Sequence, residues 1–228
     1  MWDFPDRGNW ATHDGKYRGN WSPYVPRNLI LRYSEEGDMI LDQFAGGGTT
    51  LVEAKLLRRN VIGVDVNVEA LRRCKEKCSF HWESNCNVYL KYGDARNLNF
   101  IPNEKIDLIC THPPYANMVK YSCGLHNDLS QLEMPEFLNQ MKYVAKESYR
   151  VLKPNHYCAI LMGDLRRNGY ILSLSFQVMQ IFLDAGFKLK ETIIKQQHNC
   201  KHTEKWRDIS IQRNFLLVAH EYLFVFKK

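Results

Sequence analysis

The 228-residue chain lacks any long apolar run. No stretch approaches the roughly 18–20 consecutive apolar residues that a bilayer-spanning helix needs. The first residues, 1–7, are polar and aromatic and contain no apolar core of a secretory signal peptide. We therefore expect a cytoplasmic protein that makes no membrane contact.

The chain contains cysteines but no recognisable disulfide framework. Seven cysteines are an odd number, and their spacing is not that of a disulfide scaffold, so we expect reduced and mostly buried thiols. Cys74 and Cys78 share a probable helix face, and His198, Cys200 and His202 cluster near the C-terminus. Neither set completes the four ligands of a zinc site, so the sequence predicts no metal.

Repeats, low-complexity segments and long linkers are also missing, which favours a single domain over residues 1–228. Strand-like and helix-like segments alternate, as in a parallel sheet with helices on both faces. Segments 188–195 and 221–226 alternate in polarity and are expected to be antiparallel strands at one edge. The other predicted elements are strands at 39–44, 61–66, 88–92, 106–110 and 157–162, and helices at 50–58, 69–80, 134–152 and 171–184.

Residues 1–33 break this alternation. They carry aromatic side chains among glycines and prolines, and we predict that they form an aromatic cap over the carboxyl edge of the sheet. Two interpretations stay open: the rings pack against the core, or they form a lid on a ligand pocket. The aromatic residues are Trp2, Trp10, Tyr17, Trp21 and Tyr24.

A glycine-rich motif, Asp42-Gln43-Phe44-Ala45-Gly46-Gly47-Gly48-Thr49-Thr50, follows the first predicted strand. Glycine permits positive φ and close approach of a ligand, and a turn that opens a helix exposes backbone N–H groups. The dinucleotide fingerprint G-x-G-x-x-G and the P-loop lysine are both missing. A zwitterionic ligand that bears a carboxylate therefore fits this turn better than a pyrophosphate.

Two acids follow neighbouring strands. Ligands of open α/β sheets bind beyond the carboxyl ends of the strands. Asp65 is placed to accept hydrogen bonds from the ribose hydroxyls of an adenosine, and Asp94 to accept one from an adenine amino group. The alternative for Asp65 is that its side chain only caps the next helix.

The second motif is His112-Pro113-Pro114-Tyr115, after the fourth predicted strand. The prolines fix the backbone and leave carbonyl oxygens free to accept hydrogen bonds, and Tyr115 offers a flat face for a base. The lone pair of an exocyclic base amine is delocalised into the ring. Two acceptors on its hydrogens, the His112 side chain and the Pro113 carbonyl, would localise that pair. The alternative is a structural turn with a surface tyrosine.

Together the two motifs resemble those of the S-adenosylmethionine-dependent DNA amino-methyltransferases, D-x-F-x-G-x-G-T-T and (D/N/S)-P-P-(Y/F). The resemblance spans nearly the whole chain. It implies the class I methyltransferase fold: an α/β, Rossmann-like sheet of seven mostly parallel strands, with an antiparallel last strand and helices on both faces. It also implies transfer of a methyl group to N4 of cytosine or N6 of adenine in a base flipped out of double-stranded DNA.

The family's roles can be carried over to matching positions. For the base and the chemistry, the resemblance implies His112, Pro113, Pro114 and Tyr115. For S-adenosylmethionine it implies Asp42, Phe44, Ala45, Gly46, Gly48, Thr49, Thr50, Asp65, Val66, Asp94 and Ala95.

One departure is His112, since the family's motif opens with Asp, Asn or Ser. Only neutral imidazole has an acceptor nitrogen, so we predict that activity falls as pH drops through the pKa of His112, within about pH 5.5–8. Thr111 resembles the first residue of the Thr-Ser-Pro-Pro-Tyr motif of cytosine N4 enzymes, which favours cytosine slightly.

The second departure is the absence of a separate large target-recognition domain. The net charge of +6 permits a polyanionic partner. Loops 116–132 and 198–214 are predicted to contact DNA, with ordinary surface loops as the alternative. So small a surface suits a short target site, a homodimer or a specificity subunit, and a cognate restriction endonuclease is a possible companion. The predicted contacts are Lys120, Tyr121, Lys201, Lys205, Trp206, Arg207 and Arg213.

Three other functions stay open from the sequence. The same chemistry could act on an RNA base. A glutamine or small-molecule N-methyltransferase also uses a diproline loop. A non-catalytic methyltransferase fold could serve as a nucleic-acid-binding subunit.

Overall fold

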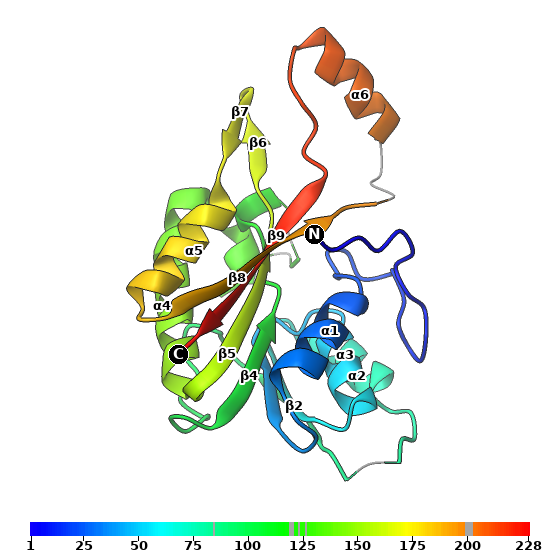
Figure 1. The fold of residues 1–228 in the computed structure, drawn as a ribbon, viewed down its shortest axis with the longest axis vertical. Coiled ribbons are helices and arrows are strands. Elements are labelled where there is room, and N and C mark those ends of the chain that lie inside the picture. Colours follow the sequence, from blue (N-terminus) through cyan, green and yellow to red (C-terminus); the bar gives the residue numbers. More distant parts are fainter. Residues whose placement is uncertain (84, 119–120, 123, 126, 199–202) are drawn as a thin grey trace.

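The computed structural model describes residues 1–83, 85–118, 121–122, 124–125, 127–198 and 203–228. Within these ranges the main sheet has seven strands, in the order β3-β2-β1-β4-β5-β9-β8 (Figure 1). The strands are β1 Met39–Asp42, β2 Asn60–Asp65, β3 Val88–Tyr92, β4 Ile106–Thr111, β5 Leu152–Met162, β8 Lys188–Gln196 and β9 His220–Lys227.

Strands β1 to β5 run parallel, and β9, the last strand in the chain, pairs antiparallel with both of its neighbours. The predicted sheet is therefore confirmed. The expected pair of antiparallel strands at one edge is also confirmed, because β8 and β9 pair antiparallel at one end of the sheet. β8 forms the edge itself and runs in the direction of β5, and β9 lies between them.

Helices cover both faces of the sheet (Figure 1). Neighbouring strand residues point to opposite sides: Ile40 packs in the cluster that contains α1, α2 and α3, whereas Leu41 packs in the cluster with α4 and α5. This alternation explains why the strands read as continuous apolar runs. The helices are α1 Tyr24–Tyr33, α2 Thr49–Leu56, α3 Val68–Lys77, α4 Met134–Val151 and α5 Leu174–Asp184, with short 3₁₀ turns η1 Ala116–Met118 and η2 Leu129–Gln131.

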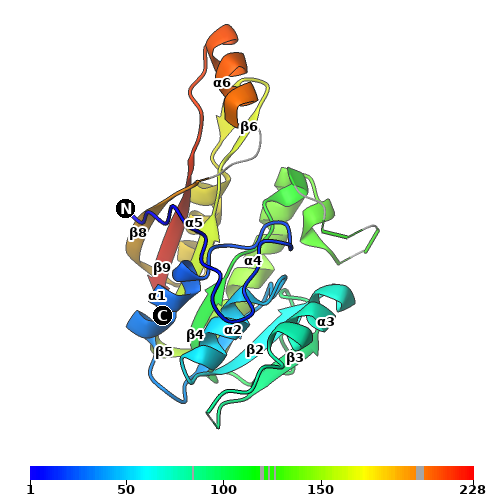
Figure 2. The ribbon, with the colours of Figure 1, turned by 90° about the vertical axis from the view of Figure 1, so that its right-hand side faces the viewer.

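A projection that the sequence did not predict extends away from the sheet (Figures 1 and 2). It consists of the hairpin β6 Leu165–Arg167 and β7 Tyr170–Leu172, and of helix α6 Thr203–Gln212 with the strand-like segment after it. Residues 198–214, expected to be a loop, thus contain a helix. Arg166 joins the two parts, since its guanidinium donates to the Leu216 carbonyl (3.0 Å) and lies 4.8 Å from the centre of the Phe215 ring. We call residues 165–172 and 203–218 the basic arm.

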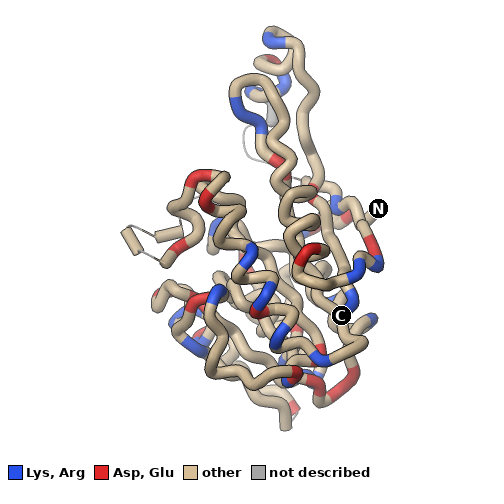
Figure 3. The backbone as a smooth tube through the Cα atoms, turned by 90° about the vertical axis from the view of Figure 1, so that its left-hand side faces the viewer, with Lys and Arg blue, Asp and Glu red and all other residues tan. Residues whose placement is uncertain are grey.

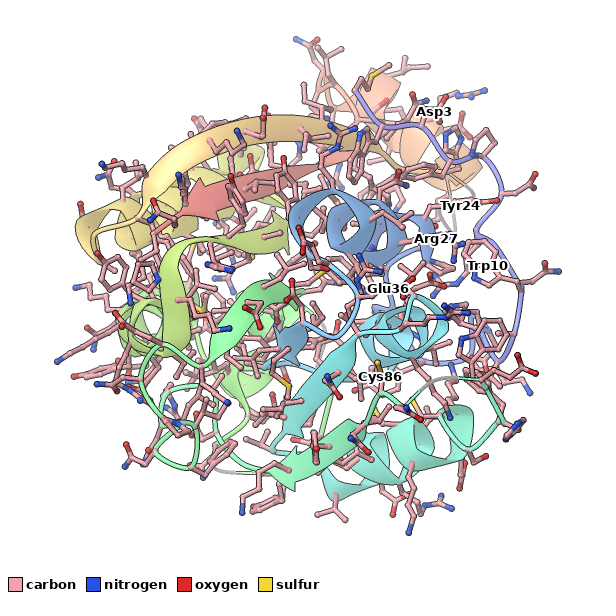
Figure 4. All side chains as sticks on the ribbon, turned by 60° about the horizontal axis from the view of Figure 1, so that its bottom comes forward. Asp3, Trp10, Tyr24, Arg27, Glu36 and Cys86 are labelled. Atoms are coloured by element: carbon pink, nitrogen blue, oxygen red, sulfur yellow. The ribbon has the colours of Figure 1, made fainter. Side chains whose placement is uncertain are left out.

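The N-terminal cap is fastened to α2 by one buried acid. Glu53 is fully buried and accepts hydrogen bonds from the Trp10 indole (2.7 Å), His13 (2.7 Å) and Arg27 (3.0 Å). Trp10, Tyr24 and Arg27 lie together where the N-terminal segment passes α1 (Figure 4), and the Trp10 and Tyr24 rings meet edge to face at 4.7 Å. The cap is therefore a packed part of the domain.

In the described ranges, every helix is too short or too polar to cross a bilayer.

Candidate functional site

The ends of β1, β2, β3 and β4 surround one cavity with about 730 Å³ of empty space, part of it open to solvent. The glycine turn contributes Gly46 to its lining, and the diproline loop contributes His112 and Pro114. Two motifs far apart in the sequence therefore meet in one pocket.

Asp42 connects the two motifs. Its side chain is buried, and Oδ1 accepts from the Phe44 N–H (3.1 Å) and from the Thr111 hydroxyl (2.9 Å). Burial raises the pKa of Asp42 to about 6, although the hydrogen bonds from Phe44 and Thr111 oppose this rise. Asp42 thus holds the turn against the strand that carries the diproline loop.

The three glycines are required for different reasons. Gly46 (φ +48°) and Gly48 (φ +78°) adopt left-handed backbone conformations that bring the chain from β1 into α2. At Gly47, a Cβ would stand 2.2 Å from Oδ1 of Asn20, so a side chain there would require Asn20 in the cap to move. Thr49 and Thr50 are buried in the first turn of α2, and Thr49 lines the cavity with Phe44 and Ala45.

The pocket has groups that suit both a diol and a carboxylate. Asp65 accepts from the Gly46 N–H (Oδ2, 2.8 Å) and the Asn67 N–H (Oδ1, 2.8 Å), which leaves each oxygen able to accept a hydroxyl. Burial raises the pKa of Asp65. The amide nitrogen of Asn20 is buried at the cavity and has no acceptor among the described residues. Because an unpaired buried donor is costly, it suits an anionic ligand group. These residues fit the ribose and carboxylate of S-adenosylmethionine.

Asp94, Val66 and Ala95 also line the cavity. The Asp94 carboxylate is held by the Arg96 guanidinium at 2.6–3.1 Å, and Arg96 also donates to Gln140 (2.6 Å). The Asp94 carboxylate therefore already has a cationic partner. The predicted contact with an adenine amino group would have to use the lone pairs that Arg96 leaves free.

The side chains of the diproline loop make hydrogen bonds and ring contacts that the sequence does not reveal. His112 lies under the Trp21 ring (5.4 Å between centres, 18° between planes), and its Nε2 is 2.7 Å from the Tyr115 hydroxyl. That hydroxyl is 2.8 Å from Glu221. A Cβ on Gly163 would stand 2.8 Å from the Tyr115 ring. Tyr115, expected as an open stacking face, therefore packs against the end of β5, and neither it nor Pro113 is part of the cavity lining.

Burial lowers the pKa of His112 to about 4, although Glu221 acts in the opposite direction. The ring is therefore neutral, as its predicted acceptor role requires. A pKa of about 4 lies below the predicted window of about pH 5.5–8. The predicted fall of activity on protonation of His112 is therefore expected at a lower pH than the sequence indicates.

The cap supplies pocket residues that the motifs do not reveal: Tyr17, Asn20 and Trp21. Tyr17 and Tyr121 lie parallel at 6.0 Å, and both line the cavity. Tyr121, predicted to contact nucleic acid, thus stands in the pocket wall. The sequence signal for Tyr17 and Trp21 is the density of aromatic side chains in residues 1–33, and Asn20 has no such signal.

The remaining predicted nucleic-acid contacts lie on the basic arm or outside the described residues. Lys205, Trp206 and Arg207 belong to α6, Arg213 follows it, and Trp206 is 51% exposed. Lys120 and Lys201 lie outside the described residues. So do Cys200 and His202. Among the residues that are described, no three His, Cys, Asp or Glu side chains converge as metal ligands do.

Comparison with known sequences identifies the family. The profile of the DNA methylase family N6_N4_Mtase matches residues 1–76 and 106–228. The Type II methyltransferase M.MjaVI of Methanocaldococcus jannaschii is 30% identical over 125 residues, 55% of this chain and 62% of that protein. The tRNA (guanine(10)-N2)-dimethyltransferase of Methanothermobacter thermautotrophicus is 35% identical over 101 residues, 44% of this chain and 29% of that protein. Each match spans less than two thirds of the relative's length.

Solved structures agree on the fold. A SAM-dependent methyltransferase of Methanosarcina mazei superposes with a TM-score of 0.61 at 15% identity, covering 88% of this chain and 96% of that one. TrmN of Thermus thermophilus has a TM-score of 0.61 at 19% identity, covering 92% and 50%. These likenesses show the class I methyltransferase fold, for which S-adenosylmethionine is the implied cofactor. The family profile matches most of this chain, and the chain therefore belongs to the DNA methylase family.

Proposed function

We propose that the protein transfers a methyl group from S-adenosylmethionine to the exocyclic amino group of a base flipped out of double-stranded DNA, N4 of cytosine or N6 of adenine. One observation carries this proposal: Gly46 and Pro114 line the same cavity. The turn suited to the methyl donor and the loop suited to the amine thus share one space. When bound, S-adenosylmethionine supplies an electrophilic methyl group on its sulfonium.

The chain's own residues would hold the amine. The neutral His112 ring would accept one of its hydrogens. The Pro113 carbonyl, whose chain neighbours His112 and Pro114 line the cavity, would accept the other, and the two bonds would localise the nitrogen lone pair. Trp21, stacked on His112 and 5% exposed, shields this position from water. Asp65 and Asn20 would hold the cofactor at the other end of the pocket.

The choice of base stays open in this proposal. Thr111 favoured cytosine in the sequence, but its hydroxyl is fully buried and donates to Asp42. That bond explains Thr111 structurally, so we give cytosine and adenine equal standing.

The basic arm is the proposed DNA-contacting surface. Figure 3 shows Lys and Arg along it. Lys205, Arg207 and Arg213 can neutralise phosphates, and the exposed Trp206 ring can stack or insert.

A second candidate is the same reaction on RNA. The observation that favours it is the similarity to a tRNA dimethyltransferase, whose name specifies a guanine amino group.

One experiment tests both candidates. The protein is expressed in a host without DNA methylation, and its genome is read by single-molecule sequencing for modified cytosine and adenine. Purified protein is also given methyl-labelled cofactor with duplex DNA, tRNA or rRNA. A sequence-specific DNA signal supports the main proposal. Label in RNA alone supports the second candidate, and cofactor binding by calorimetry without any transfer supports a non-catalytic subunit.

A further inference from the structure

Behind the diproline loop, four side chains form an unbroken line of hydrogen bonds. Lys195 on β8 is 2.9 Å from Oε2 of Glu221 on β9, Oε1 of Glu221 is 2.8 Å from the Tyr115 hydroxyl, and that hydroxyl is 2.7 Å from Nε2 of His112. Glu221 is 7% exposed, and the Lys195 side chain is 14% exposed. A buried ion pair at the antiparallel end of the sheet is thus connected to the first residue of the catalytic motif.

The direction of each bond follows from counting protons. Burial alone would raise the pKa of Glu221, but Lys195 holds it below its usual range, so Glu221 is a carboxylate and only accepts. The single proton of the Tyr115 hydroxyl therefore goes to Glu221. The Tyr115 oxygen is left to accept from Nε2 of His112. In the neutral ring Nε2 carries the hydrogen, and the lone pair is on Nδ1.

We propose that Lys195 and Glu221 are positioning residues for methyl transfer, which act through the Tyr115 hydroxyl to fix Nδ1 of His112 as the atom that accepts from the target amine. The inference rests on the proposed function. Within the described residues, Lys195 and Glu221 are not part of the cavity lining, so their effect on the reaction passes through Tyr115.

The line also explains why this chain can use histidine at the start of the motif. A carboxylate accepts hydrogen bonds at either oxygen, whereas a neutral imidazole accepts at one nitrogen only. The wrong tautomer would present a donor to the amine. Trp21 restrains the plane of the ring by stacking. The backbone of Gly19 in the cap also hydrogen-bonds to the ring, so the bond to Tyr115 selects the tautomer in competition with Gly19.

The tautomer can be measured without cofactor or DNA. Protein labelled with ¹⁵N-histidine is studied by long-range ¹H–¹⁵N NMR, and the His112 signals are assigned by their loss in His112→Asn. We expect the Nε2–H tautomer in the wild type and a mixture in Tyr115→Phe and Glu221→Gln. An Nδ1–H tautomer in the wild type, or an unchanged tautomer in both variants, overturns the inference.

Kinetics provide the second readout. Tyr115→Phe keeps the ring, and Glu221→Gln keeps the shape of the side chain. Each is expected to lower kcat for DNA methylation by about 10- to 100-fold and to leave the Kd for S-adenosylmethionine within about two-fold. The double variant should be no worse than the poorer single one, because both break the same line.

Glu191→Gln is the matched control. It lies on β8 beside Lys190 and is exposed, with a weak contact at 3.9 Å. Its kcat is expected to equal that of the wild type. Wild-type kcat in both test variants rejects the positioning role and leaves the proposed function standing. Absence of transfer by the wild type rejects the proposed function, and the NMR result still decides whether the line sets the tautomer.

Discussion

Oδ2 of Asp65 lies 2.8 Å from the backbone nitrogen of Gly46, so the acid that ends β2 holds the glycine turn that follows β1. The other oxygen accepts from the Asn67 N–H and starts the turn into α3. One carboxylate thus joins two strand ends that line the pocket. The ribose acceptor proposed for Asp65 is also a structural support of the turn.

Asp65→Ala is therefore expected to weaken S-adenosylmethionine binding by at least about ten-fold. The variant removes the carboxylate that accepts from the Gly46 N–H of the turn and that would accept from the ligand's ribose hydroxyls. Calorimetric titration measures the Kd. Glu76→Gln, an exposed acid on α3, serves as the control and should keep wild-type affinity. Equal affinities in the two variants would show that Asp65 takes no part in cofactor binding.

Gly47→Ala tests whether the cap shapes the pocket. The new Cβ would stand 2.2 Å from Oδ1 of Asn20, so Asn20 has to move away from the turn. We expect cofactor affinity to fall by about ten-fold or more. Gly15→Ala lies in the same cap, and its nearest neighbour would be an Arg7 carbon at 3.8 Å, so it should bind normally. The idea fails if Gly47→Ala binds as tightly as Gly15→Ala.

Glu53→Ala tests how the cap is fastened. The change leaves the Trp10 indole, His13 and Arg27 without their common acceptor. We expect a loss of about 3 kcal/mol in the free energy of unfolding, together with faster proteolysis within residues 1–23. Urea unfolding and limited proteolysis measure the two effects. Glu36→Ala removes an exposed partner of Arg58 at 3.6 Å and should cost less than about 1 kcal/mol.

The basic arm makes a prediction about salt. Changing Lys205, Arg207 and Arg213 together to serine should lower DNA affinity. It should also reduce the slope of log affinity against log salt by about 0.9 for each phosphate that the variant no longer neutralises. Fluorescence anisotropy at several salt concentrations gives both values. The control changes Lys75, Lys142 and Lys146, which are exposed on α3 and α4. A slope equally reduced by the control would mean that only net charge matters.

The sequence predicts the sheet and the strand-end acids because local patterns encode them. Ile40 and Leu41 are both apolar since opposite faces of the strand are buried, and Gly48 is conspicuous because α2 needs a left-handed residue before it. Glu221 and Lys195 carry no such local signal. Their importance depends on a hydrogen bond with Tyr115 across 106 residues of chain, which only the tertiary structure reveals.

The projection lacks a clear sequence signal for a related reason. Trp206 and Ile211 of α6 are exposed, so this helix is not specified by a buried apolar stripe and the segment resembles a polar loop. The cap was recognised by its aromatic residues, but the position of Asn20 over Gly47 required packing that composition does not specify.

Two groups in the pocket with pKa values shifted in opposite directions should produce opposite pH dependences of stability. The folded-state pKa of Asp42 is raised to about 6, so its contribution is fully present below its unfolded pKa of about 4 and is lost as pH rises through 6. The folded-state pKa of His112 is lowered to about 4, so its contribution is present above its unfolded pKa of about 6.5 and is lost as pH falls through 4. At 1.36 kcal/mol per pKa unit, each effect is about 3 kcal/mol.

Because these slopes largely offset each other in the wild type, single variants should reveal them. Relative to wild type, Asp42→Asn is expected to gain stability as pH rises from about 4 to 6, and His112→Asn to lose stability as pH rises over about the same window. Urea unfolding at steps between about pH 4 and 7.5 measures the differences. Asp65, whose pKa is also raised, titrates in all three proteins, and Asp42→Asn also removes the charge interaction between Asp42 and Asp65. Differences that do not change with pH would mean that neither side chain is desolvated as the pocket geometry requires, and the neutral His112 acceptor would lose its physical basis.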